Sequence, residues 1–273
     1  VPDYGKVYIS IKAKSGSNLT EVTKTSLVQS LKSFAVASVT PVIIDPETTF
    51  ITLTTTFKYD SSLTTKDIST LQTNVINSIS SYNTDTLENF TGMFRYSAVG
   101  QVIDGADTSI LSNITKIKMY KYITPTLNSG LKYTLSFNNA FYNPHSGHNA
   151  SAGGIVSSTG FKISGDDTNE HFLDDDGTGN VRTYYLSGTT RIYTDSSYGT
   201  IDYTTGEIIL TSANITSVSN VDGATSTQVR VTVTPSSNDI VPVRNQVLSI
   251  DTANSSITGS VDTIESGSSQ AGT

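Results

Sequence analysis

Apolar side chains alternate with polar ones along several stretches of the first 124 residues. In residues 6–12 the apolar positions are Val7, Ile9 and Ile11, so one side of this stretch is apolar and the other is polar. A period of two residues is typical of a half-buried strand. The same pattern predicts further strands at 38–44, 50–58 and 114–122.

One stretch between these strands follows the helical period instead. Leu27, Leu31 and Phe34 are spaced at i, i+4 and i+7 and form a single apolar stripe. Thr20 or Thr23 can cap a helix that starts here. The pattern therefore predicts a helix whose stripe faces a core.

A second helix is predicted over residues 65–82. Thr64 to Asp67 resembles a capping box in which Asp67 replaces the usual Glu. The apolar positions that follow are Ile68, Leu71, Val75 and Ile79. The order strand, helix, strand, strand, helix, strand indicates a compact α+β layer with both helices on one face of a sheet.

The pattern changes after residue 124. Leu131, Tyr133, Leu135 and Phe137 alternate with polar residues, and no helical period follows. Short strands separated by Gly, Asp and Asn turns predict a sandwich or barrel-like β domain. The later strand candidates are 170–174, 181–186, 190–194, 200–203, 207–211 and 227–234.

These patterns predict a β-rich α+β protein in three parts. Residues 1–123 form an α+β domain and residues 124–235 a mainly β domain. Residues 236–273 form a C-terminal segment that ends in a flexible Ser/Gly-rich tail at 265–273.

Composition supports a folded chain and excludes several classes of protein. Ser, Thr and Asn fill 99 of 273 positions, but Leu, Ile, Val and Phe still make up about a quarter, above the roughly one fifth below which disorder is expected. The net charge of −7 without a basic cluster argues against nucleic-acid binding. The longest apolar stretch, Phe34 to Val39, is too short to span a membrane.

Cysteine content and the N-terminal sequence add two expectations. The chain has no Cys, which removes disulfides, thiolate nucleophiles and Cys-based zinc sites. The N-terminus shows no signal-peptide pattern and no initiating Met, so we expect a processed chain or an excised fragment.

Two stretches resemble metal sites but lack essential ligands. Asp174 to Asn180 fits the start of a calcium loop, yet position 12 would be Tyr185 instead of a bidentate Glu. We therefore expect a hairpin turn there. His145 and His148, with His171 further along, lack a third nearby ligand and supporting residues. No catalytic motif is present, so we predict no enzyme activity, no cofactor and no metal.

Two stretches carry a family resemblance. The first is the opening, VPDYGKVYISIKAKSG, with the strand–helix–strand series that follows it to residue 122. The second is VTPSSNDIVPVRNQVLSID at 233–251, preceded by the hairpin YGTIDYTTGEIIL at 198–210. Together they resemble the C-terminal portion of the baseplate wedge proteins of T-even-like contractile-tailed phages, relatives of the wider J-like baseplate family. The resemblance covers most of the chain and is weakest at 140–180 and in the tail.

The resemblance implies a structural protein of the virion, assembled in the host cytoplasm. In that family two copies in each wedge pair with each other and with copies in neighbouring wedges, which closes a ring around the hub. The ring holds while the baseplate rearranges and triggers sheath contraction. The implied partners are a second copy of the chain and other wedge and hub proteins, without nucleic acid or membrane.

The segment SNDIVPVRNQ contains the candidate interface residues, which are Asn238, Asp239, Pro242, Arg244 and Asn245. Pro242 limits chain entropy, and Arg244 offers a planar fork for a carboxylate. Asn238 and Asn245 offer paired donors and acceptors. Exposed, the segment could dock a partner subunit; otherwise it covers one end of the β domain.

Two other functions remain open from the sequence. A surface adhesin or receptor-binding domain for host glycans would gather exposed aromatic residues, and the Tyr184–Tyr185 and Tyr193–Tyr198 regions are the candidates. A glycosidase would need two carboxylates about 5 to 9.5 Å apart in a cleft.

Overall fold

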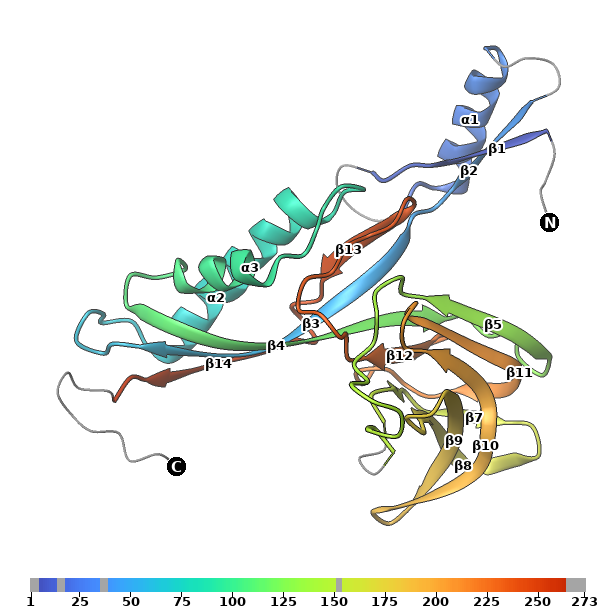
Figure 1. Ribbon diagram of the computed structural model, residues 1–273. Coiled ribbons are helices and arrows are strands. Elements are labelled where there is room, and N and C mark those ends of the chain that lie inside the picture. Colours follow the sequence, from blue (N-terminus) through green and yellow to red (C-terminus); the bar gives the residue numbers. More distant parts are fainter. Residues whose placement is uncertain (1–4, 14–17, 35–38, 151–153, 264–273) are drawn as a thin grey trace.

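The computed structural model describes residues 5–13, 18–34, 39–150 and 154–263. The first of these form a small unit made of β1 (Lys6–Ser10), α1 (Glu21–Lys32) and β2 (Thr40–Ile44). The two strands pair in parallel, and α1 lies beside them (Figure 1). The side chain of Thr20 caps α1 by accepting the backbone N–H of Thr23. We call β1, α1 and β2 the N-terminal unit.

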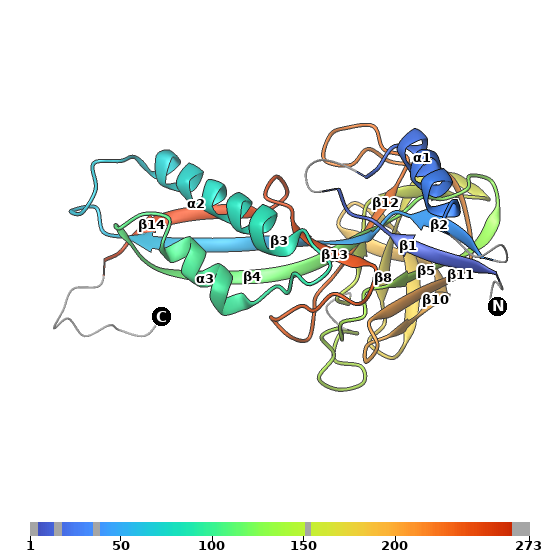
Figure 2. The ribbon, with the colours of Figure 1, turned by 90° about the horizontal axis from the view of Figure 1, so that it is seen from above.

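The central sheet starts with two long antiparallel strands, β3 (Glu47–Tyr59) and β4 (Ile110–Ile123). Between them the chain forms α2 (Ile68–Tyr82), a π-helical turn η1 (Asn83–Leu87) and α3 (Tyr96–Asp104). Figures 1 and 2 show α2 and α3 side by side on one face of this sheet. The predicted strands at 50–58 and 114–122 are therefore confirmed, and both are longer than expected.

Helix α2 confirms the predicted apolar stripe except at Ile68, which is 40% exposed, and its cap differs from the predicted one. Leu71, Val75 and Ile79 are fully buried. The helix begins at Ile68, and the carboxylate of Asp67 accepts the N–H of Thr70 at 2.9 Å. The N-cap is thus Asp67 rather than Thr64, because an aspartate is as good an N-cap as a threonine.

The predicted stripe of α1 has different surroundings. No residue of α1 is buried, and Phe34 is 89% exposed. The expectation that Leu27, Leu31 and Phe34 face a core is wrong, as is the expectation that both predicted helices share one sheet. Helix α1 contacts the separate two-stranded sheet, which is too small to bury a helix.

A closed β structure follows β4. Strands β7 to β11 form a five-stranded barrel, which closes because β10 pairs with both β9 and β11. β5 is an additional strand that pairs antiparallel with β11. The fold-class prediction of a β-rich α+β chain with a barrel-like part is confirmed. The elements are β5 (Gly130–Ser136), β7 (Phe161–Ile163), β8 (Asp166–Asp175), β9 (Asn180–Ser187), β10 (Thr190–Asp202) and β11 (Glu207–Val218).

Two details of the barrel bear on the sequence patterns. The predicted strands at 190–194 and 200–203 are one irregular strand, β10, with register shifts between them. The hairpin turn predicted between Asp174 and Asn180 joins β8 to β9, so this interpretation is confirmed.

Four strands from the second half of the chain return to the central sheet: β6 (Ser157–Ser158), β12 (Val229–Val233), β13 (Gln246–Ile250) and β14 (Ser256–Val261). β12 pairs with β4, whereas β13 and β14 both pair in parallel with β3. Gly259 of β14 approaches the ring of Phe57 so closely that an added Cβ would lie 2.5 Å from it. The proposed divisions near residues 124 and 236 stay predictions, and the tail at 265–273 lies outside the described residues.

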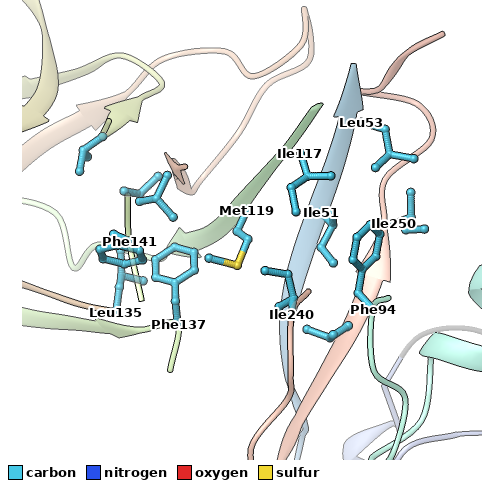
Figure 3. Close-up of a cluster of buried hydrophobic side chains, with 14 of the residues drawn as sticks. Ile51, Leu53, Phe94, Ile117, Met119, Leu135, Phe137, Phe141, Ile240 and Ile250 are labelled. Carbon is cyan, nitrogen blue, oxygen red and sulfur yellow. The ribbon is translucent and has the colours of Figure 1, made fainter. Parts of the chain in front are cut away.

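One continuous cluster of buried side chains joins the central sheet to the barrel. Figure 3 shows Met119 of β4 pointing toward Phe137, between the Ile51 and Ile117 side chains and the Phe137–Phe141 pair. Lys121 reinforces this junction by donating to Glu47 at 3.0 Å and to the carbonyl of Ser136 at 2.7 Å. No described helix has the length and apolarity needed to cross a membrane.

Candidate protein interface

The candidate residues lie in the connection between β12 and β13, which we call the crossing segment (residues 236–245). Its middle is fixed to the body of the molecule. Ile240 is fully buried and exchanges two backbone hydrogen bonds with Phe94, at 2.9 and 3.0 Å. The crossing segment is thus anchored at one residue, and its flanks determine what it offers to a partner.

Asp239 has an internal role. Its carboxylate accepts the N–H of Tyr96 at 3.0 Å and pairs with Arg95 at 2.8 Å, at the start of α3. These two contacts lower the pKa of Asp239. A carboxylate is stabilised at a helix N-terminus, where backbone N–H groups are unpaired. Asp239 therefore positions the crossing segment against α3.

Val241 and Val243 follow on the outer side. Asn139 holds the backbone of Val241 by two hydrogen bonds of 3.0 Å, one to its N–H and one to its carbonyl. Both valine side chains remain exposed. Sequence patterns missed the roles of Asn139 and Arg95, because these residues lie 102 and 144 positions away from their partners.

Arg244 has an unusual backbone conformation. Its φ is +31°, and residues other than glycine rarely adopt a positive φ. The turn around it is closed by hydrogen bonds from Gln246 N–H to the Val243 carbonyl and from Glu47 N–H to the Asn245 carbonyl. The Arg244 side chain is exposed and has no carboxylate partner among the described residues. Residues held in such sparsely populated backbone conformations cluster at functional sites.

Arg244 and Asn245 border a pocket of about 350 Å³, which we call the junction pocket. Its other walls are Tyr8, Ser10 and Ile44 of the N-terminal unit and Phe90 of the body. Alternation along the strands places Ser10 and Ile44 on the face opposite that of Pro41 and Ile43, the two buried residues of β2. The sequence-predicted Arg244 thus meets the open face of the two-stranded sheet.

The N-terminal unit exposes a large amount of apolar surface. Parallel strands are usually buried on both faces, yet this pair has α1 on one face and the junction pocket on the other. The exposed side chains of the unit are Val7, Tyr8, Val22, Phe34 and Val39.

The five predicted interface residues do not form one cluster. Asp239 caps α3, Arg244 and Asn245 border the junction pocket, and Pro242 is half-buried between them. Asn238 is exposed and borders a different groove, on the central sheet. The structure therefore brings only Arg244 and Asn245 to the N-terminal unit.

The aromatic residues considered for glycan binding are already stacked. The guanidinium of Arg182 lies 4.3 Å from the centre of the Tyr193 ring, and that of Arg191 lies 4.6 Å from that of Tyr184. Both arginines pair with the buried carboxylate of Asp174. An arginine thus covers one face of each of these two rings; Tyr184 is buried, whereas Tyr193 stays 42% exposed.

The histidines do not assemble into a metal centre. His145 and His148 contact each other at 3.2 Å in an exposed loop, whereas His171 is buried in the barrel near Asp166. Within the described ranges, no group of three or more His, Asp and Glu side chains is arranged to hold a metal ion.

Comparisons with known proteins address the parts of the chain separately. Residues 1–44 match the family model described as baseplate structural protein gp6, C-terminal domain I, and residues 47–122 match C-terminal domain III of the same protein. These ranges correspond to the N-terminal unit and to the segment from β3 to β4. The barrel lies outside both ranges.

A curated relative agrees with these two matches. The baseplate wedge protein gp6 of Enterobacteria phage T4 is 31% identical over 134 residues, which cover 47% of this chain and 20% of that protein. The match thus spans a fifth of the relative's length. The two adjacent domain matches and this relative agree, and together they support the C-terminal part of a baseplate wedge protein as the counterpart of residues 1–122.

Proposed function

We propose that this structural baseplate protein joins wedges by self-association, through the end of the molecule formed by the N-terminal unit and Arg244. Copies paired in this way would close a ring around the hub and hold it during the change that triggers sheath contraction. A structural role follows from the family. Self-association, the ring, the contacts with other wedge and hub proteins and assembly in the host cytoplasm belong to the proposal.

The observation that carries the proposal is Arg244. A strained backbone at an exposed residue persists only where the surrounding structure imposes it, and such positions concentrate at functional sites. The planar guanidinium fits a carboxylate through two parallel hydrogen bonds. In a two-fold dimer each copy would supply one arginine and one acceptor, so a single residue would act twice.

The surroundings of Arg244 match the composition of protein interfaces. Val241, Val243 and Tyr8 provide exposed apolar surface next to the guanidinium. Interface centres are enriched in aromatic residues and arginine, with polar groups at the rim. Asn245 and Pro242 would lie in this contact, Asn238 at its periphery, and Asp239 would hold the crossing segment in place.

The continuous core supports the transmission of movement. The central sheet and the barrel share one cluster of buried side chains. At their junction, burial lowers the pKa of Lys121, and the nearby carboxylate of Glu47 opposes this shift. Interiors packed in this way deform little. A shift applied to the barrel would therefore reach Ile240 of the crossing segment, a member of this cluster, as a rigid-body displacement.

The test is the solution mass of the chain with Arg244→Gly. Glycine adopts positive φ without strain, so the variant should unfold at an equal or higher denaturant concentration. Loss of an interface arginine should nevertheless weaken the dimer about tenfold or more. Sedimentation equilibrium over a range of concentrations measures both masses and dissociation constants.

Lys132→Gly is the matched control, because Lys132 is exposed on β5 and is not among the residues that line the junction pocket. It should leave the dimer unchanged. A wild-type chain that stays monomeric at high concentration, or an Arg244→Gly variant that dimerises like the wild type, would refute the proposed interface.

A further inference from the structure

The face of the central sheet opposite α2 and α3 is open along β3, β4 and β14. Alternation along the strands gives this face the side chains at even positions, such as Thr54 and Thr56, since Leu53 and Phe57 are buried beneath the helices. Register pairs Thr54 with Lys116 and Thr52 with Lys118. Figure 1 shows no described helix or strand covering this face beside β14.

A groove of about 780 Å³ lies on this face, where β4 leaves the sheet for the barrel. Lys116 and Lys118 of β4 and Thr54 of β3 border it on one side. Tyr142 and the start of the crossing segment, Ser236 and Asn238, border it on the other. We call this feature the lysine groove.

The charges of the lysine groove are unbalanced. Its lining includes no Asp or Glu. Neither lysine has an ion pair or a side-chain hydrogen bond among the described residues, whereas Lys66 pairs with Asp107 and Lys121 with Glu47. The whole chain carries a net charge of −7. Two adjacent unpaired cations in an acidic protein therefore form a locally positive site.

The spacing of the two ammonium groups defines the complementary ligand. Residues two apart on a strand lie about 6.6 Å apart along it, which equals the spacing of alternate side chains in another extended chain. The hydroxyls of Thr54 and Ser236 and the amide of Asn238 can bond its backbone. Tyr142 and Ile114, which is 67% exposed on the same face, can contact apolar groups.

We propose that the lysine groove docks an extended acidic segment of a partner protein, with carboxylates at alternate positions that pair with Lys116 and Lys118. The site uses none of the residues of the junction pocket and shares only Asn238 with the periphery of the proposed dimer contact. A polyanion such as DNA is a poor ligand, since two cations neutralise too few phosphates on an acidic protein.

A simpler explanation makes a different prediction. β12 pairs with β4 only from Met119 to Ile123, so the earlier part of β4 has no strand on that side within the described ranges. Lysines on such an edge discourage pairing with other chains. If Lys116 and Lys118 serve only this purpose, an acidic peptide should not bind in a saturable way.

The experiment titrates the chain into a fluorescein-labelled peptide of ten residues with alternating Glu and Thr, followed by fluorescence anisotropy. The wild type should bind it saturably, and binding should weaken as salt is raised. Lys116→Glu with Lys118→Glu should weaken binding at least tenfold. A peptide of equal composition with its Glu residues in one block should bind less tightly.

The matched control reverses two exposed lysines elsewhere, with Lys32→Glu and Lys132→Glu. It changes the net charge equally and should keep the wild-type affinity. Equal weakening in both double variants, or no saturable binding by the wild type, overturns the proposal. Lys116→Gln with Lys118→Gln repeats the test if the reversed charges impair folding.

Measured without peptide, the mass of the groove variant separates the two sites. An unchanged dimer places the lysine groove outside the self-contact. The opposite result would be loss of the dimer in the Lys116→Glu, Lys118→Glu variant while Arg244→Gly still dimerises. It would mean that a second copy of the chain occupies the lysine groove, and it would overturn the acidic-partner proposal.

Discussion

Helices α1 and α2 carry apolar stripes of similar spacing, but the two stripes lie in different surroundings. In α2, Leu71, Val75 and Ile79 are fully buried against the central sheet. In α1, Leu27 and Leu31 are half-buried, and no residue of the helix is buried. The difference comes from the sheets: α2 lies on one of six strands and α1 on a pair.

The comparison separates two consequences of hydrophobic periodicity. The spacing determines that a segment forms a helix and which side is apolar. It does not determine whether the same chain supplies enough surface to cover that side. An apolar stripe that the chain leaves half-covered is therefore evidence for a partner, which agrees with our assignment of the N-terminal unit to an interface.

The largest expected effect tests this difference directly. Leu71→Ala removes a fully buried side chain and should lower the free energy of unfolding by about 2 to 5 kcal/mol. Leu31→Ala removes a half-buried one and should cost under about 1 kcal/mol, since less apolar area is lost. Urea denaturation of both variants, followed by circular dichroism, gives the two values.

That measurement should be made on the monomer, at concentrations below the dimer dissociation constant. If Leu31→Ala costs as much as Leu71→Ala there, the N-terminal unit has a core of its own and the comparison fails. A cost for Leu31→Ala that emerges only at higher concentration would link α1 to the dimer.

Acid should destabilise the body through a carboxylate near its helices. Asp107 follows α3, and the ammonium of Lys66 and the N–H and hydroxyl of Ser109 lower its pKa from 3.8 to about 2. A lowered pKa stabilises the fold above the ordinary value and loses this effect as the pH falls. The melting temperature should therefore drop between about pH 4 and pH 2.

Lys66→Ala should move this loss to higher pH, because Asp107 would then titrate closer to 3.8. Lys116→Ala, which removes a lysine without a carboxylate partner among the described residues, is the control and should leave the pH profile unchanged. Identical profiles for wild type and Lys66→Ala would exclude the ion pair as the cause.

The smallest expected effect concerns the helix caps. Asp67→Ala and Thr20→Ala each remove the side chain that accepts an N–H in the first turn, and such losses cost about 1 kcal/mol. Asp67→Ala should lower the free energy of global unfolding, because α2 is part of the central body. Thr20→Ala should lower only the free energy of local opening of α1. Hydrogen exchange of the α1 amides distinguishes the two, and faster exchange in α1 alone after Thr20→Ala is expected.

The sequence patterns predicted those helices, strands and turns whose formation depends mainly on residues close together in the sequence. The α2 stripe, the β3 and β4 strands and the β8–β9 hairpin all follow from side-chain periods or turn residues. Helix α3 was missed because it is short and contains Gly100. Strands β13 and β14 were missed because Ser, Thr and Gly interrupt their apolar residues, and β3 supplies the missing order by pairing with them.

The candidate interface was predictable only in part. The SNDIVPVRNQ string placed Arg244 and Asn245 in the right segment, but no local signal reveals that Arg95 holds Asp239 or that the backbone of Arg244 has positive φ. Lys116 and Lys118 did have a signal, since they alternate with Ile117 in a predicted strand. Their proposed role depends on the lack of Asp and Glu among the described residues that line the groove, which only the three-dimensional arrangement reveals.

The pairing of β13 and β14 with β3 has a consequence for the order of events during synthesis. The hydroxyls of Thr56 and Thr258 bond across 202 residues, so β3 stays without these two neighbours until residues 246–261 have been made, after the barrel. Contacts of such long range slow folding, and an unpaired edge is prone to aggregation in the meantime. A nascent or truncated copy that lacks β14 would therefore have an incomplete central sheet, because β3 would miss one of its neighbours.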